Sequence, residues 1–167
     1  MSFRGFLAQQ SVNWRSLRAP PGAWIMEEFL AQVGIDCAAQ ALPPEFVRLV
    51  PHACFDNTAR LVRRMRCKLR YCEGYIGRDD LPIPIHHAWA IDADNRVIDP
   101  TLAEPEKYSF IGFPISLAER RRWISEHSQS VFDTGVGRNV KFMVQQHPPL
   151  LDLIDTRYHH LITGEKS

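Results

Sequence analysis

The sequence predicts an α+β fold, in which a helix packs on an antiparallel sheet and further helices flank that sheet. Two observations support this prediction. Apolar residues recur at helical spacing across residues 53–66, and a segment with strand-like alternation, 69–76, follows almost at once. Two more strand-like segments, 85–91 and 96–99, are separated only by the turn-forming residues 92–95, which is typical of an antiparallel hairpin.

Length and composition favour one domain over residues 1–167, with an N-terminal arm (1–22), a catalytic-like core (43–115) and C-terminal helices and tail (116–167). Hydrophobic residues make up 45% of the chain and charged residues 23%, which is a globular mixture. These properties leave the oligomeric state undetermined. The cysteines are few for this length and no secretory signal is evident, so we expect reduced thiols at Cys37, Cys54, Cys67 and Cys72.

Charge and hydropathy argue against two kinds of partner. The formal net charge of +1 implies no general attraction to nucleic acid or to an anionic membrane. No apolar run approaches the roughly 20 residues that cross a bilayer, and the first ten residues lack the apolar stretch and cleavage site of a signal peptide. We therefore expect a cytoplasmic protein without a nucleic-acid or membrane partner.

The expected elements before the core are few. Residues 1–22 read as an irregular arm that ends at Pro20 and Pro21. A helix is expected over 23–33, with Gly34 placed to end it. Residues 37–42 read as a connection, and the two prolines at 43–44 open a short helical turn through residue 50.

In the core, the helix at 53–66 has an apolar face and a face rich in arginine. That arginine cluster also fits a nucleic-acid surface, but no aromatic residues are interleaved with it, so we interpret it as a solvated face. The strand at 69–76 is closed by Gly77, and 78–84 reads as a loop before the hairpin.

After the core, the capping pattern from Ser116 to Glu119 opens a helix to about residue 127. The tail contains a short apolar segment at 142–144, which fits an edge strand, and an amphipathic helix near 150–158.

Cys54 lies in the first turn of its expected helix. The unpaired N–H groups and the helix dipole favour a negative charge there, and therefore a thiolate. No Ser, Thr, Asp or Asn directly precedes Cys54 to occupy those donors. The alternative is that Cys54 is a small, buried apolar residue.

Hairpin register selects between the adjacent histidines His86 and His87, which face opposite sides of a strand. A loop with an odd number of residues, 93–95, places Trp89 opposite Asp99, with His87 diagonal to Asp99 at roughly 7 Å. An even loop leaves His86 about 13 Å from Asp99, at ~3.3 Å per residue. Only His87 forms a workable pair with Asp99. A thiol, an imidazole and a carboxylate are the parts of a cysteine nucleophile site.

The segment from Cys54 to Thr101 resembles the catalytic core of transglutaminase-like proteins, within the broader papain-like cysteine fold. The resemblance rests on the cysteine that opens a helix and on three motifs, namely Glu73-Gly74-Tyr75, His87-Ala88-Trp89 and Asp99-Pro100-Thr101. It implies a helix packed on an antiparallel sheet. It also implies Cys54 as nucleophile, His87 as general base and acid, and Asp99 as the orienting carboxylate. For this chain we expect a protein or peptide substrate and no cofactor or metal.

One feature of papain-type peptidases is missing. They carry a glutamine a few residues before the nucleophile, and here Val47, Arg48 and Leu49 occupy that region. The oxyanion therefore depends on the Cys54 N–H and a second donor, for which His52 and Asn57 are the candidates. These two residues and Trp89, which is placed to shield the thiolate–imidazolium pair or simply to fill the core, complete the expected substrate-binding set.

Three classes of function remain open. The first is a thiol-dependent acyl-transfer enzyme, with hydrolysis or deamidation favoured over cross-linking because a second recognition domain is not evident. The second is a catalytically inactive binding module with the same fold. The third is a zinc protein using Cys54, Cys67, Cys72 and the paired histidines, but no Cys-x-x-Cys pair is present.

Overall fold

The computed structural model describes residues 1–17, 26–65, 68–78, 80–118, 120–121 and 154–160. The described helices are α1 (Phe3–Leu17), α2 (Met26–Val33) and α3 (Cys54–Arg64), with short 3-10 helices η1 (Pro105–Lys107) and η2 (Thr156–Tyr158). The strands are β1 (Ile35–Cys37), β2 (Arg70–Arg78), β3 (Leu81–Ile91), β4 (Val97–Ile98) and β5 (Ser109–Ile115). They form one antiparallel sheet in the order β1-β5-β2-β3-β4, which confirms the predicted α+β class.

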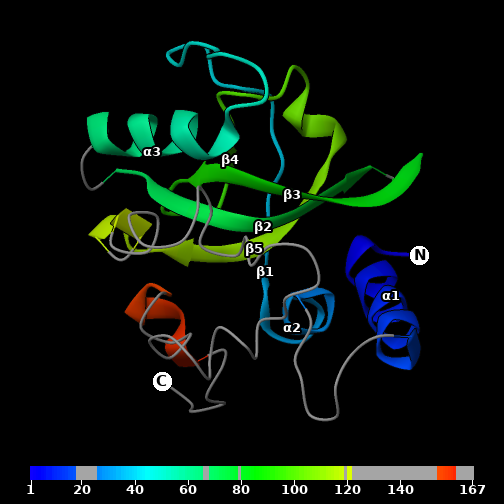
Figure 1. The fold of residues 1–167 in the computed structure, drawn as a ribbon. Helices are drawn as coiled ribbons and strands as arrows, with labels where there is room; N and C mark the ends of the chain where they lie inside the picture. Colours follow the sequence, from blue (N-terminus) through cyan, green and yellow to red (C-terminus); the bar gives the residue numbers. More distant parts are fainter. Residues whose placement is uncertain (18–25, 66–67, 79, 119, 122–153, 161–167) are drawn as a thin grey trace.

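The sheet curls until its two edges meet. Ala38, just after β1, receives a hydrogen bond from Val97 N–H (2.8 Å) and donates one to Asn95 O (3.0 Å). The inner face of the curl carries a small apolar cluster. The other face carries the main core, to which α1, α2 and α3 all contribute (Figure 1). Among the described helices, none is long and apolar enough to cross a membrane.

The expectation of an irregular arm is wrong for its first part, because residues 3–17 form α1. Ser2 caps this helix through a hydrogen bond from Gly5 N–H to its Oγ (3.1 Å). The inward positions are Phe3, Leu7 and Ser11. Because Ser11 is polar, the sequence of α1 does not show a complete helical repeat of apolar residues. The prolines that end the expected arm lie outside the described residues.

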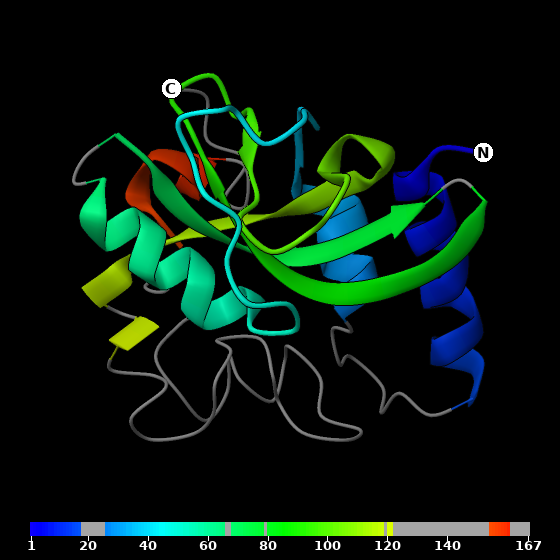
Figure 2. The same ribbon diagram turned by 90° about the horizontal axis from the view of Figure 1, so that it is seen from above.

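The next expectations are partly confirmed. Helix α2 ends as predicted, with the Gly34 N–H bonded to Leu30 O (3.0 Å), although residues 23–25 are outside the described part. Strand β1 was not predicted, and it lies before the expected connection, sharing only Cys37 with it. The helical turn expected through residue 50 is wrong. Only a tight turn forms, with Phe46 N–H bonded to Pro43 O (3.0 Å), and the chain then runs as a loop on the same side of the sheet as α3 (Figures 1 and 2).

Helix α3 and strand β2 confirm the predicted helix and strand of the core, but Gly77 does not end the strand, which continues to Arg78. The expected loop over 78–84 is wrong, since β3 already begins at Leu81 despite Pro82 and Pro84. Prolines fit here because β4 pairs only with Ala90 and Ile91, which leaves the outer side of the earlier part of β3 without a strand neighbour in the described structure.

Strand β5 was not predicted, although it lies between β1 and β2 in the sheet. Its sequence is apolar on both faces and contains Gly112 and Pro114, so it shows neither alternation nor an unbroken run of strand-forming residues. Gly112 is required, because a Cβ there would lie 2.6 Å from the Trp89 ring and would overlap the Glu73 carbonyl oxygen.

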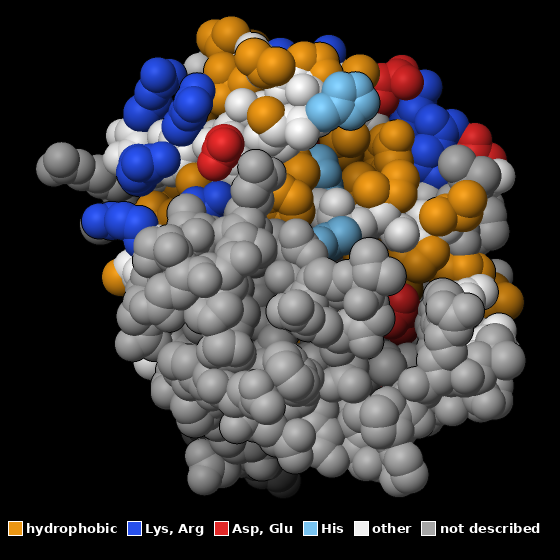
Figure 3. Space-filling model, in the orientation of Figure 1, with side chains coloured by type: hydrophobic (Ala, Val, Ile, Leu, Met, Phe, Trp, Pro, Cys, Tyr) orange, Lys and Arg blue, Asp and Glu red, His pale blue; other side chains and the backbone are white. Residues whose placement is uncertain are grey.

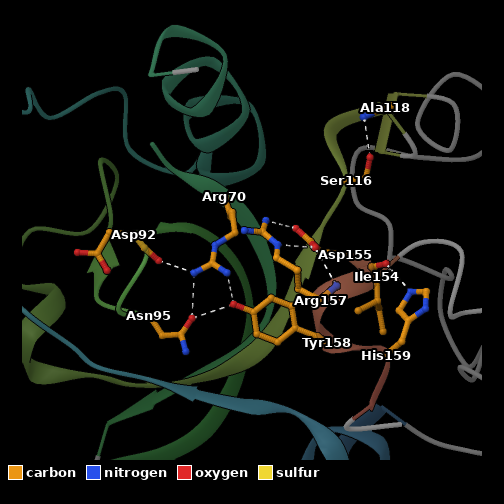
Figure 4. A network of polar contacts seen from close by, with 10 residues as sticks. All are labelled: Arg70, Asp92, Asn95, Ser116, Ala118, Ile154, Asp155, Arg157, Tyr158 and His159. Carbon is orange, nitrogen blue, oxygen red and sulfur yellow. Dashed lines mark hydrogen bonds and ion pairs between the residues drawn. The ribbon is translucent and has the colours of Figure 1, made fainter. Parts of the chain in front are cut away.

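The hairpin register is the predicted one. Ala90 pairs with Ile98 and Ile91 with Val97, so the loop is odd and Asp99 follows β4 on the side of Trp89. Arg70 braces the turn, donating to Asp92 O (2.5 Å) and Asn95 Oδ1 (3.1 Å) and to the Tyr158 hydroxyl (Figure 4).

The C-terminal part is described only in pieces. The helix predicted after Ser116 does begin there, with the Ser116 Oγ accepting from Ala118 N–H (3.3 Å), but Glu119 and residues 122–127 lie outside the described residues. The segment 142–144 also lies outside them. The helix expected over 150–158 is wrong for the described residues of that segment. Ile154 instead bridges to Ile115, and the helical part begins only with η2 and continues into His159 and His160.

Candidate active site

Cys54 is the first residue of α3. The residue before it, Ala53, makes no side-chain capping hydrogen bond, as predicted, and the first intrahelical bond runs from Asn57 N–H to Ala53 O (2.8 Å). The N–H groups of the first turn are therefore not occupied by a capping side chain. The approach to the helix includes His52, whose φ of 63° is unusual for a residue with a Cβ.

His87 and Asp99 form a buried pair. His87 Nε2 lies 2.6 Å from Asp99 Oδ2, and the pair is almost fully shielded from solvent. The other carboxylate oxygen, Oδ1, accepts the backbone N–H groups of Thr101 (2.7 Å) and Leu102 (3.0 Å). The loop after β4 thus fixes the carboxylate, and the carboxylate fixes the imidazole.

Cys54 is the second partner of His87. Burial lowers the pKa of His87, but hydrogen bonds and charge interactions with Asp99 and Cys54 raise the pKa more, to about 9. His87 thus has two side-chain partners, Asp99 and Cys54. The structure therefore brings together the three side chains that the sequence predicted, and it favours a charged imidazole at neutral pH.

Trp89 lies beside the imidazole and is fully buried. The two rings are stacked, with centroids 6.4 Å apart and planes 14° apart, and Phe110 contacts the far side of Trp89 edge-on at 5.1 Å. At this position Trp89 keeps water from His87 and Asp99, but it presents no surface to a substrate. Its Nε1 is buried without a hydrogen-bond partner.

The two candidate oxyanion donors differ in their placement. Asn57 is buried, and its Nδ2 donates to Val50 O (2.6 Å) and Thr101 Oγ1 (3.1 Å). Both amide hydrogens are used, so Asn57 joins the loop before Cys54 to the loop after Asp99 instead of facing a substrate. His52 is exposed, two residues before Cys54.

Polar residues behind the site were not predicted from the sequence. His86 points to the opposite face from His87, as expected. On that face its Nε2 lies 3.7 Å from Glu73 Oε2, and its ring contacts the Phe55 ring with centroids 5.2 Å apart.

Glu73 is fully buried and accepts a hydrogen bond from the Tyr71 hydroxyl at 2.5 Å. Burial raises the pKa of Tyr71, and the charge of Glu73 raises it further, so the hydroxyl keeps its proton. The motif Glu73-Gly74-Tyr75 was the only sequence signal for this cluster.

Two further contacts attach the start of α3 to the rest of the protein. The Thr58 hydroxyl donates to Ala88 O at 3.0 Å, and Arg120 donates to Phe55 O at 3.2 Å while its guanidinium lies 4.9 Å from the centre of the Tyr71 ring. These contacts set the position of Cys54 relative to β3.

Within the described residues, no group of three or more His, Cys, Asp or Glu side chains is arranged to hold a metal ion. Cys37, Cys54 and Cys72 carry free thiols, and Cys67 lies outside the described part of the chain. Comparisons with protein-family models, with curated proteins and with solved structures found no match to this chain.

Proposed function

We propose that this protein is a thiol-dependent acyl-transfer enzyme of the transglutaminase-like type, with a papain-like core, and that it acts on amide bonds of protein or peptide substrates in the cytoplasm. The observation that supports this most strongly is the double contact of His87, with Asp99 at Nε2 and with the side chain of Cys54. An imidazole held by a carboxylate and next to a thiol is the arrangement that activates a cysteine nucleophile.

In the first half-reaction, the Cys54 sulfur attacks the carbonyl carbon of the amide and a C–S bond forms. The carbonyl oxygen becomes negative next to the uncapped start of α3, where the Cys54 N–H is one donor. The C–N bond then breaks while His87 gives its proton to the leaving nitrogen. An amine or ammonia departs, and a thioester remains on Cys54.

In the second half-reaction, water attacks the thioester carbonyl and His87 accepts the proton of the water. The C–S bond breaks, a carboxylic acid is released, and the thiolate–imidazolium pair is restored. Asp99 stabilises the imidazolium throughout. Hydrolysis and deamidation need only water as acceptor, so we propose them ahead of transamidation, in which an amine takes the place of water.

The test compares two cysteines of similar accessibility. Cys54 is 8% exposed and Cys37 is 7% exposed, so a difference in their reactivity reports activation and not access. With iodoacetamide at pH 6, followed by mass-spectrometric mapping, Cys54 should be alkylated at least about tenfold faster than Cys37. His87→Gln should remove that difference. Equal rates in the folded wild-type protein would leave an inactive binding module as the better account.

Incubation with a glutamine-containing protein and a labelled primary amine then separates the reactions. Both deamidation and transamidation of glutamine release ammonia, so the label distinguishes them. Ammonia or a cleaved peptide without incorporation of label is the expected result. Label incorporated in an amount close to the ammonia released would reverse our order of the two reactions.

A further inference from the structure

We propose that exposed apolar side chains next to the triad recognise a peptide that carries apolar residues beside the reacting carbonyl group. This inference depends on the proposed function, since it assigns a substrate class to that same site. The side chains come from two stretches of chain, the loop that leads into Cys54 and the part of β3 that leads into His87.

Exposed large hydrophobic residues are few in the described part of the chain, and they are unevenly placed. Of the six, four lie in those two stretches. The full set is Met1, Val12, Val47, Val50, Ile83 and Ile85. Figure 3 shows hydrophobic side chains gathered around histidines in the upper part of one face of the molecule. Exposed apolar residues that cluster instead of being scattered mark a binding surface.

The loop with Val47 and Val50 is fixed by hydrogen bonds. Leu49 N–H donates to Pro100 O (2.8 Å), and Asn57 Nδ2 donates to Val50 O (2.6 Å). The backbone is therefore attached both to α3 and to the loop after Asp99, while the two valine side chains remain in solvent. A surface that is ordered before binding loses little conformational entropy when a ligand arrives.

Ile83 and Ile85 lie on the same face of β3 as His87, because every second residue of a strand faces the same side. Ile85 is two residues from His87, about 7 Å along the strand. Both isoleucine side chains are exposed, whereas the next residues on that face, His87 and Trp89, are buried. A peptide that reaches the triad along this face contacts the two isoleucines first.

The backbone of β3 limits how a peptide can bind there. Ala88 O points outward to Thr58, and Asp92 N–H points outward to Arg96 of the hairpin partner. The backbone groups of every second residue in a strand point to the same edge, so those of Pro82 and Pro84 point to the open edge as well. Proline has no N–H to donate there. A peptide cannot extend the sheet by a regular hydrogen-bond ladder at these positions, so its recognition depends on side chains.

Charge supports an apolar occupant. Residues 81–87 contain no Lys, Arg, Asp or Glu. The stretch of β3 that carries the two isoleucines, residues 81–85, is uncharged throughout. A charged substrate side chain placed against it would lose water without gaining a charged partner there, which is unfavourable.

The test uses tripeptide chloromethyl ketones with Leu, Glu or Lys at the two residues before the reactive carbonyl. The Cys54 sulfur forms a C–S bond to the methylene carbon and displaces chloride. We expect the Leu compound to modify Cys54 at least about tenfold faster than the Glu and Lys compounds, which is the size of discrimination that apolar contacts give.

Variants assign that preference to the surface. In Ile83→Ser/Ile85→Ser, and separately in Val47→Ser/Val50→Ser, the ratio of the Leu rate to the Glu rate should fall several-fold. The control Val12→Ser, an exposed apolar residue of α1, should keep the wild-type ratio. Equal rates for the three compounds, or a wild-type ratio in both double variants, would overturn this inference while leaving the proposed function intact. Iodoacetamide labelling of Cys54 and Cys37 tests the proposed function separately.

Discussion

The hydroxyl of Thr58 donates a 3.0 Å hydrogen bond to the carbonyl oxygen of Ala88, and both residues are fully buried. Thr58 lies one helical turn after Cys54, and Ala88 directly follows His87. This bond is therefore one of the contacts that join the helix of the thiol to the strand of the imidazole. It helps to set the spacing on which a proton transfer between the two side chains depends.

Thr58→Val should destabilise the protein and slow the alkylation of Cys54. The change keeps the shape of the side chain but leaves a buried carbonyl without its donor, which costs about 1–3 kcal/mol. Urea unfolding measures the first effect and iodoacetamide kinetics the second. Thr58→Ser keeps the hydroxyl and should keep the alkylation rate. A Val variant that matches the wild type in both measurements would show that this bond does not position the site.

Asp99→Asn should keep the fold and lose most of the activity. The amide oxygen can still accept the N–H groups of Thr101 and Leu102, but the negative charge that raises the pKa of His87 is gone. We expect the pKa of His87, followed by NMR, to fall below its value of about 9. Peptide hydrolysis should fall on the order of 10³- to 10⁴-fold.

The control for this variant is Asp94→Asn, which removes an exposed carboxylate from the same hairpin and should change neither quantity. A normal rate in Asp99→Asn would remove Asp99 from the catalytic machinery.

Stability should decrease as the pH rises from about 6.5, the usual pKa of His in an unfolded chain, to about 9, the pKa of His87 in the fold. Between these values the folded protein binds the His87 proton and the unfolded chain does not, so raising the pH favours unfolding. The contribution is complete below pH 6.5 and is lost above pH 9. It amounts to at most about 3 kcal/mol.

Urea unfolding of the wild type and of His87→Gln at several pH values between 6 and 9.5 isolates this effect. The difference in unfolding free energy between the two proteins should shrink as the pH rises. A difference that stays constant over that range would mean that His87 is not held in its charged form.

Gly112→Ala should destabilise the protein strongly. The new Cβ would overlap the backbone oxygen of Glu73 in the next strand and press on the Trp89 ring, and a backbone oxygen inside a sheet cannot move aside. We expect a loss of several kcal/mol in thermal or urea unfolding. Gly5→Ala is the matched control, because its Cβ would meet only the Ser2 and Met1 side chains. It should leave stability unchanged or raise it slightly.

Local features were predictable from the sequence. The pairing of His87 with Asp99 follows from one hairpin, whose turn length fixes which side chains share a face, and the two residues are only 12 positions apart. The uncapped start of α3 follows from Val50-Pro51-His52-Ala53. These relationships depend on neighbours in the chain, so a sequence contains the information needed to infer them.

Relationships over long separations were not predictable in the same way. The Asn57 amide donates a hydrogen bond to Thr101, 44 residues later. Arg120 supports α3 by donating to the carbonyl oxygen of Phe55, 65 residues before it. Strand β5 was missed because a strand covered on both faces needs no alternation. Helix α1 was missed because a buried serine occupies one of its inward positions.

The two prolines of β3 also affect how copies of this protein meet in solution. An unpaired outer strand is a place where a second molecule can add its own strand and begin an aggregate. Pro82 and Pro84 remove two donors from that side of β3, and the Thr58 hydroxyl already occupies the outward carbonyl of Ala88. The protein can therefore keep exposed isoleucines at this border without offering a template for self-association.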